Sequence, residues 1–398
     1  MKNIDTVSLS EKRVLLRVDF NVPIDKNQNI LEEERILAAL PTIRKLISDQ
    51  AKIIIISHLG RPKGRDLSLS LKAVATRLSS LLRKNVLFSD DCISEKNNLI
   101  ISGMSAGDVL LLENLRFYKE EKEGVVEFAR KLAAYGDVFV NDAFGVSHRK
   151  HCSVYTIASF FPKNKYSGYL LNNEINFLEK AVLNPKRPLT AIIGGAKISS
   201  KIEVIKSLLN KVDNLIVGGG MAYTFAKSMG GSIGNSILEE DKINVALEII
   251  QIAKRKNVNL LIPLDSVNAK EYKNNSENYI SKISHIDDGY MGLDIGPESI
   301  KLFKECINRS NSIIWNGPMG VFEMDNFSNG TKLIAKAICE QTKAGAFSIV
   351  GGGDSVAAIK RFNLHKKVSY ISTGGGAMLS YLEGEILPGV TALKSSFE

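Results

Sequence analysis

The sequence predicts an α/β fold with two doubly wound, parallel-sheet domains joined by a hinge helix. Apolar runs rich in β-branched residues alternate along the chain with segments whose apolar residues have helical spacing. Strands that alternate with helices in this way form parallel sheets covered by helices on both faces. The chain has 398 residues, which exceeds the ~250–300 residues that one core usually serves. Two Rossmann-like domains are therefore expected.

The expected strands and helices follow from this alternation. Strands are predicted at Val14–Val18, Ile53–Ile56, Val109–Leu112, Val138–Val140, Ala191–Ile193, Leu215–Val217, Leu260–Pro263, Ile313–Trp315, Phe347–Val350 and Val368–Ser372. Helices are predicted at Leu71–Leu82, Val125–Ala134, Ile202–Leu209 and Val245–Ala253.

Composition divides the chain near residue 183. Of the 31 glycines, 8 lie up to Leu183, whereas 11 of the 15 arginines lie in that first part. The segment from Leu171 to Pro188 is interpreted as a helix ended by two prolines, Pro185 and Pro188, which suits an interdomain connector. Arginine binds carboxylate and phosphate through its planar fork, and glycine turns bind phosphate through backbone N–H groups. We therefore expect an arginine-lined anion site in the first domain and a backbone-lined nucleotide site in the second.

Several classes of protein are disfavoured by composition. The chain has no apolar run of the ~18 residues needed to span a bilayer, and its start lacks the apolar core of a signal peptide. The four cysteines are widely spaced without a CxxC pattern, which indicates reduced thiols in a cytoplasmic protein. The net charge of +9 is compatible with nucleic acid, but no Lys/Arg run is long enough for a basic arm. Small polyanionic substrates explain the charge as well.

The stretch Phe347–Ser355 joins a predicted strand to a predicted helix through three glycines. Glycine permits a sharp turn with bare N–H groups, and a helix N-terminus favours an anion such as phosphate. Asp354 would repel that phosphate unless it holds a metal ion or caps the helix. The stretch predicts either a Mg²⁺-nucleotide site or a tight turn capped by Asp354.

Polar motifs follow each predicted strand of the first half. Asp19 and Asn21 come after the first strand, where they suit substrate hydroxyls or form an Asx-turn before Pro23. Because the carboxyl ends of parallel strands share one edge of a sheet, the basic residues of the other motifs should gather there: His58, Arg61, Arg116, His148 and Arg149. Arg35 is placed in a first helical turn, where a surface ion pair with the preceding glutamates is the alternative.

The second half repeats this arrangement with glycine. Ile192–Lys201 is interpreted as a strand, a glycine turn and a helix with Lys197 and Lys201 on one face, with a solvated lysine pair as the alternative. Val217–Met221 and Thr373–Ala377 are further glycine turns. Asn316–Glu323 places the Glu323 carboxylate after a rigid loop, where it suits ribose hydroxyls.

Some nucleotide-binding motifs are absent from the sequence. No Gly-Lys dipeptide occurs, so there is no Walker A motif, and the protein-kinase motifs are missing. None of the glycine turns completes G-x-G-x-x-G, because Tyr223, Val356 and Leu379 occupy the third glycine position. This disfavours an NAD-dependent oxidoreductase of doubly wound fold, which remains the alternative, and leaves a phosphoryl-transfer enzyme of another type.

The chain resembles the phosphoglycerate kinase family from end to end. The motifs that carry the resemblance occur in the family's order: Arg17–Pro23, His58–Pro62, Glu113–Phe117, Asp142–Arg149, Gly194–Lys201, Leu293–Pro297, Asn316–Glu323, Gly351–Ser355 and Thr373–Ala377. The resemblance implies phosphoryl transfer between 1,3-bisphosphoglycerate with ADP and 3-phosphoglycerate with ATP, in glycolysis, by a cytoplasmic monomer. The chain departs from the family's commoner wording at Leu171–Glu174, at Ser355 (often threonine) and at Met378 (often serine), which puts only hinge details in doubt.

The resemblance also implies the roles of individual residues. Substrate binding is implied for Asp19, Phe20, Asn21, Arg35, His58, Leu59, Gly60, Arg61, Arg116 and Arg149. Nucleotide binding is implied for Gly194, Lys197, Lys201, Gly292, Glu323, Gly352, Gly353, Asp354 and Ser355, with Gly292 near adenine, Glu323 on ribose and Ser355 capping the helix beside the phosphates. Asp354 would carry Mg²⁺.

The domains implied by the resemblance have defined boundaries. Residues 1–170 would bind 3-phosphoglycerate, 171–187 would form the hinge helix, 188–378 would bind the nucleotide, and 379–398 would return to the first domain. Since an acyl phosphate is a good donor, catalysis needs mainly positioning and charge neutralisation in an in-line transfer. Arg35, Lys197 and the backbone N–H groups of Gly352, Gly353, Gly375 and Gly376 are expected to hold the moving phosphoryl oxygens. Domain closure would exclude water.

Overall fold

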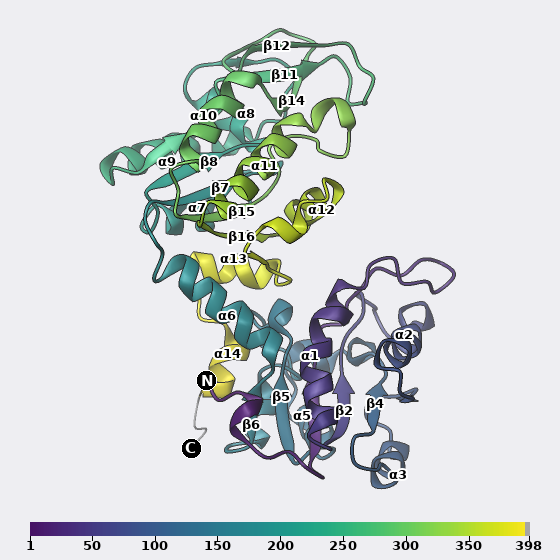
Figure 1. The fold of residues 1–398 in the computed structure, drawn as a ribbon. Helices are drawn as coiled ribbons and strands as arrows, with labels where there is room; N and C mark the ends of the chain where they lie inside the picture. The colour runs from purple at the N-terminus through teal and green to yellow at the C-terminus, as the bar shows by residue number, and fades with distance from the viewer. Residues whose placement is uncertain (395–398) are drawn as a thin grey trace. The chain divides into compact units, whose positions relative to one another are not determined.

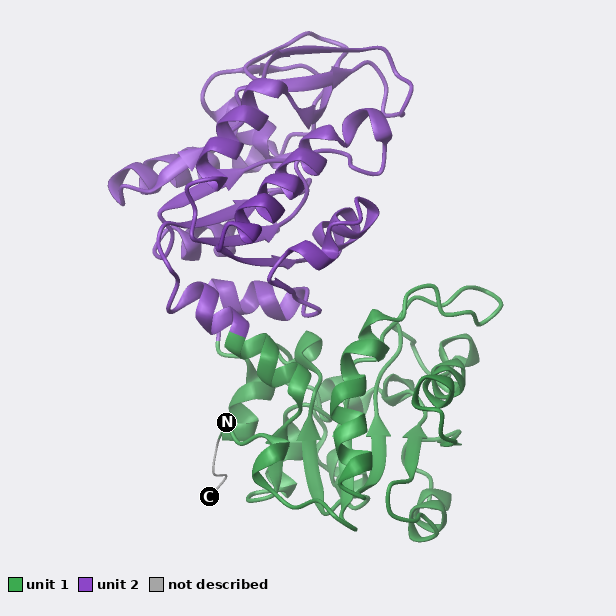
Figure 2. Cartoon of the chain, in the orientation of Figure 1, with its two compact units in different colours: residues 1–176, 386–398 green, residues 177–385 purple. Residues whose placement is uncertain are grey.

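The protein folds as two compact units. The structure, a computed structural model, describes residues 1–394. Unit 1 comprises Met1–Asn176 together with the chain from Ile386 on, and unit 2 comprises Phe177–Glu385 (Figure 2). Helix α6, Tyr169–Val182, contains the point at which unit 1 passes into unit 2.

Unit 1 is built on a six-stranded parallel sheet. Its strands are β1 (Arg13–Arg17), β2 (Lys52–Ile56), β3 (Val86–Ser89), β4 (Val109–Leu112), β5 (Val138–Asn141) and β6 (Lys165–Ser167). Their order is β3-β4-β2-β1-β5-β6, so β1 lies between β2 and β5. The chain winds away from β1 on one side and returns to pair with it on the other. Such a reversal is the point where open α/β sheets bind ligands, beyond the carboxyl ends of the strands.

Helices of unit 1 connect these strands (Figure 1). They are α1 (Glu34–Ser48), α2 (Lys72–Leu82), α3 (Lys96–Ser102), α4 (Glu120–Glu123) and α5 (Val126–Ala133). Helix α14, Pro388–Lys394, also belongs to unit 1 and contacts β6. Its Gly389 N–H donates to the Ser147 carbonyl over 2.8 Å, next to the end of β5.

Unit 2 contains a second six-stranded parallel sheet. Its strands are β7 (Leu189–Ile193), β8 (Asn214–Val217), β10 (Asn259–Leu261), β15 (Ser312–Asn316), β16 (Phe347–Gly351) and β17 (Tyr370–Ile371), in the order β10-β8-β7-β15-β16-β17. The helices are α7 (Ile202–Leu208), α8 (Met221–Ser228), α9 (Ile243–Arg255), α10 (Pro297–Ile307), α11 (Asn329–Lys343), α12 (Gly353–Arg361) and α13 (Gly376–Glu383).

The fold class and the ten predicted strands are confirmed, with shifts of one or two residues at most strand ends. Strands β3 and β6 were not predicted. An antiparallel sheet of β11 (Asp265–Ala269), β12 (Asn278–Lys282) and β14 (Met291–Ile295), and the short pair β9 (Ser232–Ile233) and β13 (His285–Ile286), were also missed. Strand β12 is largely exposed and polar, so it lacks the apolar run by which the buried parallel strands are recognised.

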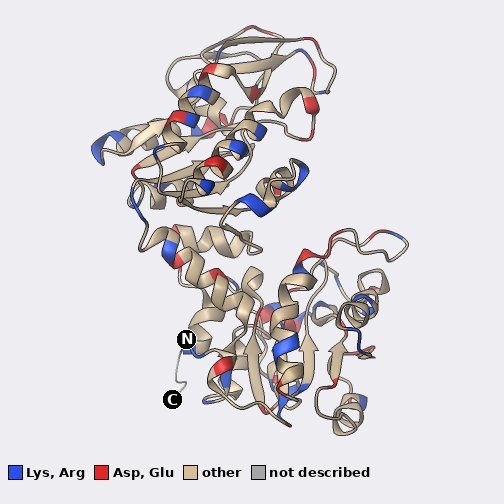
Figure 3. Ribbon diagram, viewed as in Figure 1, with Lys and Arg blue, Asp and Glu red and all other residues tan. Residues whose placement is uncertain are grey.

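None of the helices in residues 1–394 combines the length and the apolar composition that crossing a membrane requires. Lysine and arginine are spread over the helices of both units and are interspersed with aspartate and glutamate (Figure 3).

A buried carboxyl group holds the start of α6. Asp142 follows β5, and its Oδ1 accepts a hydrogen bond from the Leu171 N–H over 3.0 Å. Thr42 of α1 accepts from the Tyr169 N–H over 2.9 Å. Burial raises the pKa of Asp142 from 3.8 to about 7, although hydrogen bonds from Thr42 and from the backbone of Leu171 oppose the shift. The folded unit therefore keeps a proton on Asp142 that the unfolded chain releases at lower pH.

This proton gives a testable pH dependence. Because the folded pKa is raised, the stabilisation is fully present below pH 3.8 and is lost as the pH rises towards about 7. We expect the free energy of unfolding of the wild type to fall relative to that of Asp142→Asn over this window, by up to about 1.4 kcal/mol per pH unit. Denaturant unfolding of both proteins from pH 4 to 8 measures the difference. Parallel stability curves would contradict the assignment.

Candidate active site

Polar and basic side chains of unit 1 meet at the carboxyl edge of its sheet. Arg35, in the first turn of α1, lies with Nη1 2.8 Å from Asp19 Oδ2. Asn21 Oδ1 accepts from the Gly60 N–H over 2.7 Å, and Arg116 Nη1 donates to the Gly60 carbonyl over 2.6 Å. Three separate loops, after β1, β2 and β4, are thereby held together.

The basic groups at this edge are crowded. Arg116 is only 5% exposed, and its Nε is buried without a hydrogen-bond partner. Burial lowers the pKa of Arg116 to about 10, and the positive charges of Arg17 and Arg149 add to the shift. A bound anion would relieve this repulsion and would offer the missing acceptors. The arrangement is therefore suited to a polyanionic ligand.

His58 lies inside the same cluster and is 2% exposed. Burial lowers its pKa well below the usual value of 6.5, and the charges of Arg17, Arg116 and Arg35 lower it further. The imidazole is consequently neutral at neutral pH. It can bind an anion by donating a hydrogen bond but adds no charge.

The remaining predicted substrate residues are placed differently. Arg61 is exposed, and Arg149 Nε contacts His148 Nε2 over 3.1 Å. The side chains of Phe20 and Leu59 are buried in the core of unit 1. Their backbone N–H groups already donate to Ser57 Oγ and Asn114 Oδ1, so these two residues contribute to the shape of the site rather than offering free donors.

Unit 2 contains a cavity of about 500 Å³ at the carboxyl edge of its own sheet. Its walls combine apolar side chains, including Ile237, Met291 and Val321, with the backbone of several glycines. Gly292 borders the cavity, and the carboxylates of Glu323 and Asp354 line it. An apolar cavity with a few polar groups at its margin is typical of a small-molecule site.

Glycine is required where the loops of this cavity approach one another. A Cβ on Gly194 would lie 2.1 Å from the Pro318 carbonyl oxygen, so no side chain fits at the end of β7. Gly352 has φ of 89°, a left-handed conformation that favours glycine. The Gly194 N–H donates to the Asn316 carbonyl over 2.9 Å, so this glycine allows the loops to pack closely together.

The predicted capping of α12 is wrong. The N-cap is Gly352, and neither Asp354 nor Ser355 makes a capping hydrogen bond, because both lie within the first helical turn. The buried Ser355 hydroxyl instead accepts from the Gly317 N–H over 2.5 Å. Ser355 thus ties α12 to the loop after β15, and the N-terminus of α12, at Gly353, keeps its N–H groups without a side-chain cap. Gly375, with φ of 43°, begins α13 in the same way.

The helix predicted at Ile202–Leu209 is present as α7, but the prediction that Lys197 and Lys201 lie on one helix face is wrong. Residues 194–201 form turns, and α7 begins only at Ile202, with Lys201 as its N-cap. Glu239 accepts hydrogen bonds from the Ser199 N–H and hydroxyl, which holds this segment as a loop. Lys197 is exposed, whereas Lys201 is partly buried and its Nζ contacts Asn316 Oδ1.

The charge of Asp354 affects the pKa of Lys201. Burial lowers the pKa of Lys201, and the negative charge of Asp354 opposes that shift. Asn316 Nδ2 also donates to the Gly351 carbonyl over 3.0 Å, so one amide joins the lysine to the glycine turn after β16. Asn316 lies inside the motif Asn316–Glu323, but the sequence alone did not predict this role for it.

The donors present fit Mg²⁺ bound together with a nucleotide. The residues that the structure describes contain no group of three or more His, Cys, Asp or Glu side chains able to hold a metal on their own. Mg²⁺ keeps several waters and is usually bound through one or two carboxylates and substrate phosphates. The exposed Asp354, beside the N-terminus of α12, supplies one such carboxylate.

Other residues near the unit 1 cluster were not recognised from the sequence. Arg17, Glu121 and Ser153 are fully buried and connected by hydrogen bonds. Ser153 lies 136 residues after Arg17 and 32 residues after Glu121, so no short motif contains all three.

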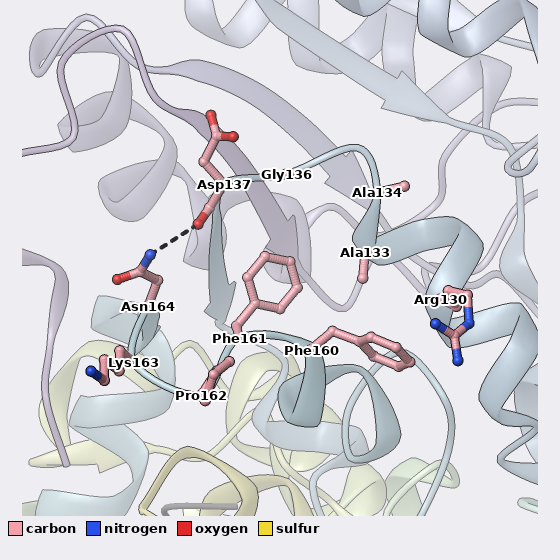
Figure 4. A pocket seen from close by; sticks show the side chains of 10 residues that line it. All are labelled: Arg130, Ala133, Ala134, Gly136, Asp137, Phe160, Phe161, Pro162, Lys163 and Asn164. Carbon is pink, nitrogen blue, oxygen red and sulfur yellow. Dashed lines mark hydrogen bonds between the residues drawn. The ribbon is translucent and has the colours of Figure 1, made fainter.

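A second cavity, of about 510 Å³, lies at the other end of the unit 1 sheet (Figure 4). It is lined by Arg130 and Phe160, by Gly136 and Asp137 just before β5, and by Asn164 just before β6. Arg130 forms an ion pair with Glu127 over 3.2 Å, and its guanidinium lies over the ring of Phe160. None of the predicted site residues lines this cavity.

Comparison with known proteins gives consistent matches over nearly the whole chain. A profile of the family "Phosphoglycerate kinase" matches residues 4–385. The cytosolic phosphoglycerate kinase 3 of Arabidopsis thaliana is 50% identical over 385 residues, which are 97% of this chain and 96% of that protein. Phosphoglycerate kinase of Microcystis aeruginosa is 50% identical over 393 residues, 98% of each chain. The solved structure of phosphoglycerate kinase from Coxiella burnetii has a TM-score of 0.89 at 40% identity and covers 98% of each chain.

Proposed function

This chain belongs to the phosphoglycerate kinase family, and we propose that the unit 1 cluster binds phosphoglycerate and the unit 2 cavity binds the nucleotide. The activity of the chain is reversible phosphoryl transfer between 1,3-bisphosphoglycerate with ADP and 3-phosphoglycerate with ATP. The NAD-dependent oxidoreductase receives no support from the comparisons. The observation that carries the assignment of the sites is the pairing of a basic cluster at one sheet edge with a glycine-lined cavity at another.

The unit 1 cluster supplies donors for each part of phosphoglycerate. We assign Asp19 and Asn21 to the glycerate hydroxyl, and Arg35, His58, Arg61, Arg116 and Arg149 to the carboxylate and the phosphate. The partnerless Nε of Arg116 and the crowding of positive charge support this assignment. Arg35 Nη1 is paired with Asp19, and a guanidinium has five N–H donors, so Arg35 can contact Asp19 and a substrate oxygen together.

The unit 2 cavity supplies the corresponding groups for ADP and ATP. The apolar walls and Gly292 accept the base, Glu323 accepts from ribose hydroxyls, and Lys197 and Lys201 follow the phosphates. The N-terminus of α12 at Gly352 and Gly353, with Ser355 fixing the adjoining loop, favours negative charge through the helix dipole. Gly194 and Gly375 have no side chain that would cover the backbone at these positions.

Phosphoryl transfer then needs positioning rather than a protein nucleophile. In the ATP-consuming direction the substrate carboxylate attacks the terminal phosphorus atom, and ADP leaves. Arg35, Lys197 and the backbone N–H groups of Gly352 and Gly375 donate to the phosphoryl oxygens as charge is redistributed over them. Mg²⁺, when held by Asp354 and the phosphates, supplies further charge neutralisation. Direct transfer requires the two substrates to meet, so we expect the units to close around them and exclude water during turnover.

A coupled assay tests this function. ATP formation from 1,3-bisphosphoglycerate and ADP should be rapid with Mg²⁺ and strongly reduced when a chelator removes the metal. Absence of ATP formation in the presence of Mg²⁺, from protein with an intact fold, would contradict the proposal.

Asp354→Asn tests the metal assignment separately. The variant keeps the size of the side chain but removes the charge, so we expect it to weaken binding of Mg-ADP by about tenfold or more, as for a lost charge-assisted contact of 1.5–3 kcal/mol. Calorimetric titration with and without Mg²⁺ measures the change, and binding of metal-free ADP serves as the control. Equal Mg-ADP affinity in the variant and the wild type would leave Asp354 as an ordinary residue of the first turn of α12.

The location and oligomeric state remain proposals. We assign the protein to the cytoplasm because one relative is described as cytosolic, although another, phosphoglycerate kinase 2 of the same plant, is described as chloroplastic. The four free cysteines agree with a reducing compartment. We propose a monomer, which light scattering tests against the chain mass of 43.7 kDa.

A further inference from the structure

Behind the anion-binding cluster of unit 1 lies a fully buried arginine. Arg17 ends β1 and is 0% exposed. Its Nε donates to Ser153 Oγ over 2.8 Å, and its Nη2 lies 3.1 Å from His58 Nδ1. Its Nη1 donates to the Val18 carbonyl. A buried guanidinium requires an opposing charge and partners for its hydrogen atoms, and these contacts supply the partners.

Glu121 supplies an opposing charge. This residue of α4 is also 0% exposed. Its Oε1 accepts from the Ser153 hydroxyl over 2.6 Å, and its Oε2 accepts from the Ser153 N–H over 3.0 Å. Burial lowers the pKa of Arg17 and raises that of Glu121, and each charge opposes the shift of the other. Ser153 therefore joins two charges that stabilise one another.

The contact with Arg17 determines which nitrogen of His58 carries a hydrogen. An arginine side chain has donors and no acceptor, so a nitrogen that bonds to it must accept. His58 Nδ1 is in that position, and its distance of 3.9 Å from Asp19 Oδ1 is too long for a competing hydrogen bond. The ring is also neutral, because its pKa is lowered well below the usual value. In a neutral ring with Nδ1 as acceptor, the hydrogen is on Nε2.

We propose that Arg17, supported by Ser153 and Glu121, is a positioning residue that holds His58 in the Nε2–H tautomer. The carboxylate and phosphate of phosphoglycerate, to which we assign His58, accept hydrogen bonds, and Nδ1 is occupied by Arg17, so His58 binds these groups only if its Nε2 donates. The opposite tautomer would present a lone pair at Nε2 and would repel the substrate. This inference rests on the proposed function, which places phosphoglycerate at the unit 1 cluster.

The first test uses the unaltered protein. In ¹⁵N-labelled protein without ligand, long-range ¹H–¹⁵N correlation spectra distinguish a protonated ring nitrogen from one that accepts. The His58 signals are assigned by their loss in His58→Gln. We expect an accepting Nδ1 and a protonated Nε2 at neutral pH. A protonated Nδ1, in either the neutral or the cationic ring, would overturn the proposal without any bearing on substrate binding.

The second test removes both buried charges together. Losing one partner alone would leave an unpaired buried charge, whereas the double variant Arg17→Met/Glu121→Gln leaves none. We expect a substantial Nδ1–H population of His58 and a rise of about 10–100-fold in KM for 3-phosphoglycerate, as for a lost hydrogen bond to a charged group. The kcat should change much less, because the contact is made equally before and during transfer.

The matched control lies at the other end of β1. Arg13 pairs with Asp137 over 2.6 Å, and both are about 40% exposed. Arg13→Met/Asp137→Asn should leave the His58 spectrum and the KM unchanged. An unchanged tautomer in Arg17→Met/Glu121→Gln would overturn the positioning role. A changed tautomer with a normal KM would show instead that His58 does not bind the substrate, which is a failure of the proposed site.

Discussion

Arg35→Ala is expected to lower kcat by about 10²–10³-fold, comparable to the loss of one oxyanion-hole donor. The guanidinium lies at the start of α1, where its Nη1 is 2.8 Å from Asp19 Oδ2. It therefore belongs to the unit 1 cluster that we assign to phosphoglycerate and can donate to the moving phosphoryl group. Steady-state kinetics with saturating substrates measure kcat, and ADP binding should change little because Arg35 belongs to unit 1.

The matched control for Arg35 is Arg44→Ala. Arg44 lies on the same helix but is exposed and donates to the Leu81 carbonyl over 3.3 Å, away from the cluster. It should keep normal turnover. Near-normal kcat in Arg35→Ala would remove Arg35 from the catalytic assignment, whereas an equal loss in both variants would indicate damage to α1 rather than to catalysis.

Lys197→Ala should also lower kcat by about 10²–10³-fold, with a smaller effect on ADP affinity. Lys197 is exposed in a loop rather than fixed on a helix, and Glu239 holds the adjoining Ser199. A long side chain on such a loop can follow a phosphoryl group between two positions. Single-turnover kinetics separate the transfer step from nucleotide binding.

The control for this variant is Lys206→Ala on α7. Lys206 makes a surface ion pair with Glu248 over 3.1 Å, and such pairs contribute about 0–1 kcal/mol. Its loss should leave kcat near that of the wild type. If Lys197→Ala instead retained full turnover, the phosphoryl contact would have to come from another cation, such as Lys201.

The parallel sheets were predictable because their strands are buried on both faces. In β1, Val14, Leu15 and Leu16 are completely buried, and such runs stand out in a sequence. Since the strands are parallel, the residues after each strand had to share one edge, which is why Asp19, His58 and Arg116 could be expected together. The antiparallel sheet was missed because β12 faces solvent and is polar.

Local helical signals led to wrong predictions at two of the glycine turns of unit 2. Lys197 and Lys201 have helical spacing, but Gly194 is confined by the Pro318 carbonyl and Ser199 is held by Glu239, so the chain stays in a loop. Asp354 and Ser355 resemble capping residues, yet the N-cap of α12 is Gly352, two residues before Asp354 and three before Ser355. In both segments, contacts with residues far away in the sequence determine the backbone conformation. A short stretch of sequence does not reveal such contacts.

The buried support of the basic cluster could not be found from sequence spacing. The three residues come from different parts of the chain: Arg17 from β1, Glu121 from α4 and Ser153 from a loop. In the sequence, none of them differs from an ordinary polar surface residue. Only the folded unit shows that Ser153 joins the two charges and that Arg17 contacts His58. The functional significance of these residues lies in their burial, which a single sequence does not reveal.

The most direct test of the account is to map both substrates on the backbone amides of the labelled protein. We predict that 3-phosphoglycerate alone shifts resonances around Asn21, Gly60 and Arg116 in unit 1. Mg-ADP alone should shift those around Gly292 and Gly352 in unit 2. If both ligands shifted the same unit, or if 3-phosphoglycerate left the unit 1 cluster unperturbed at saturation, the division of the two sites between the units would be wrong.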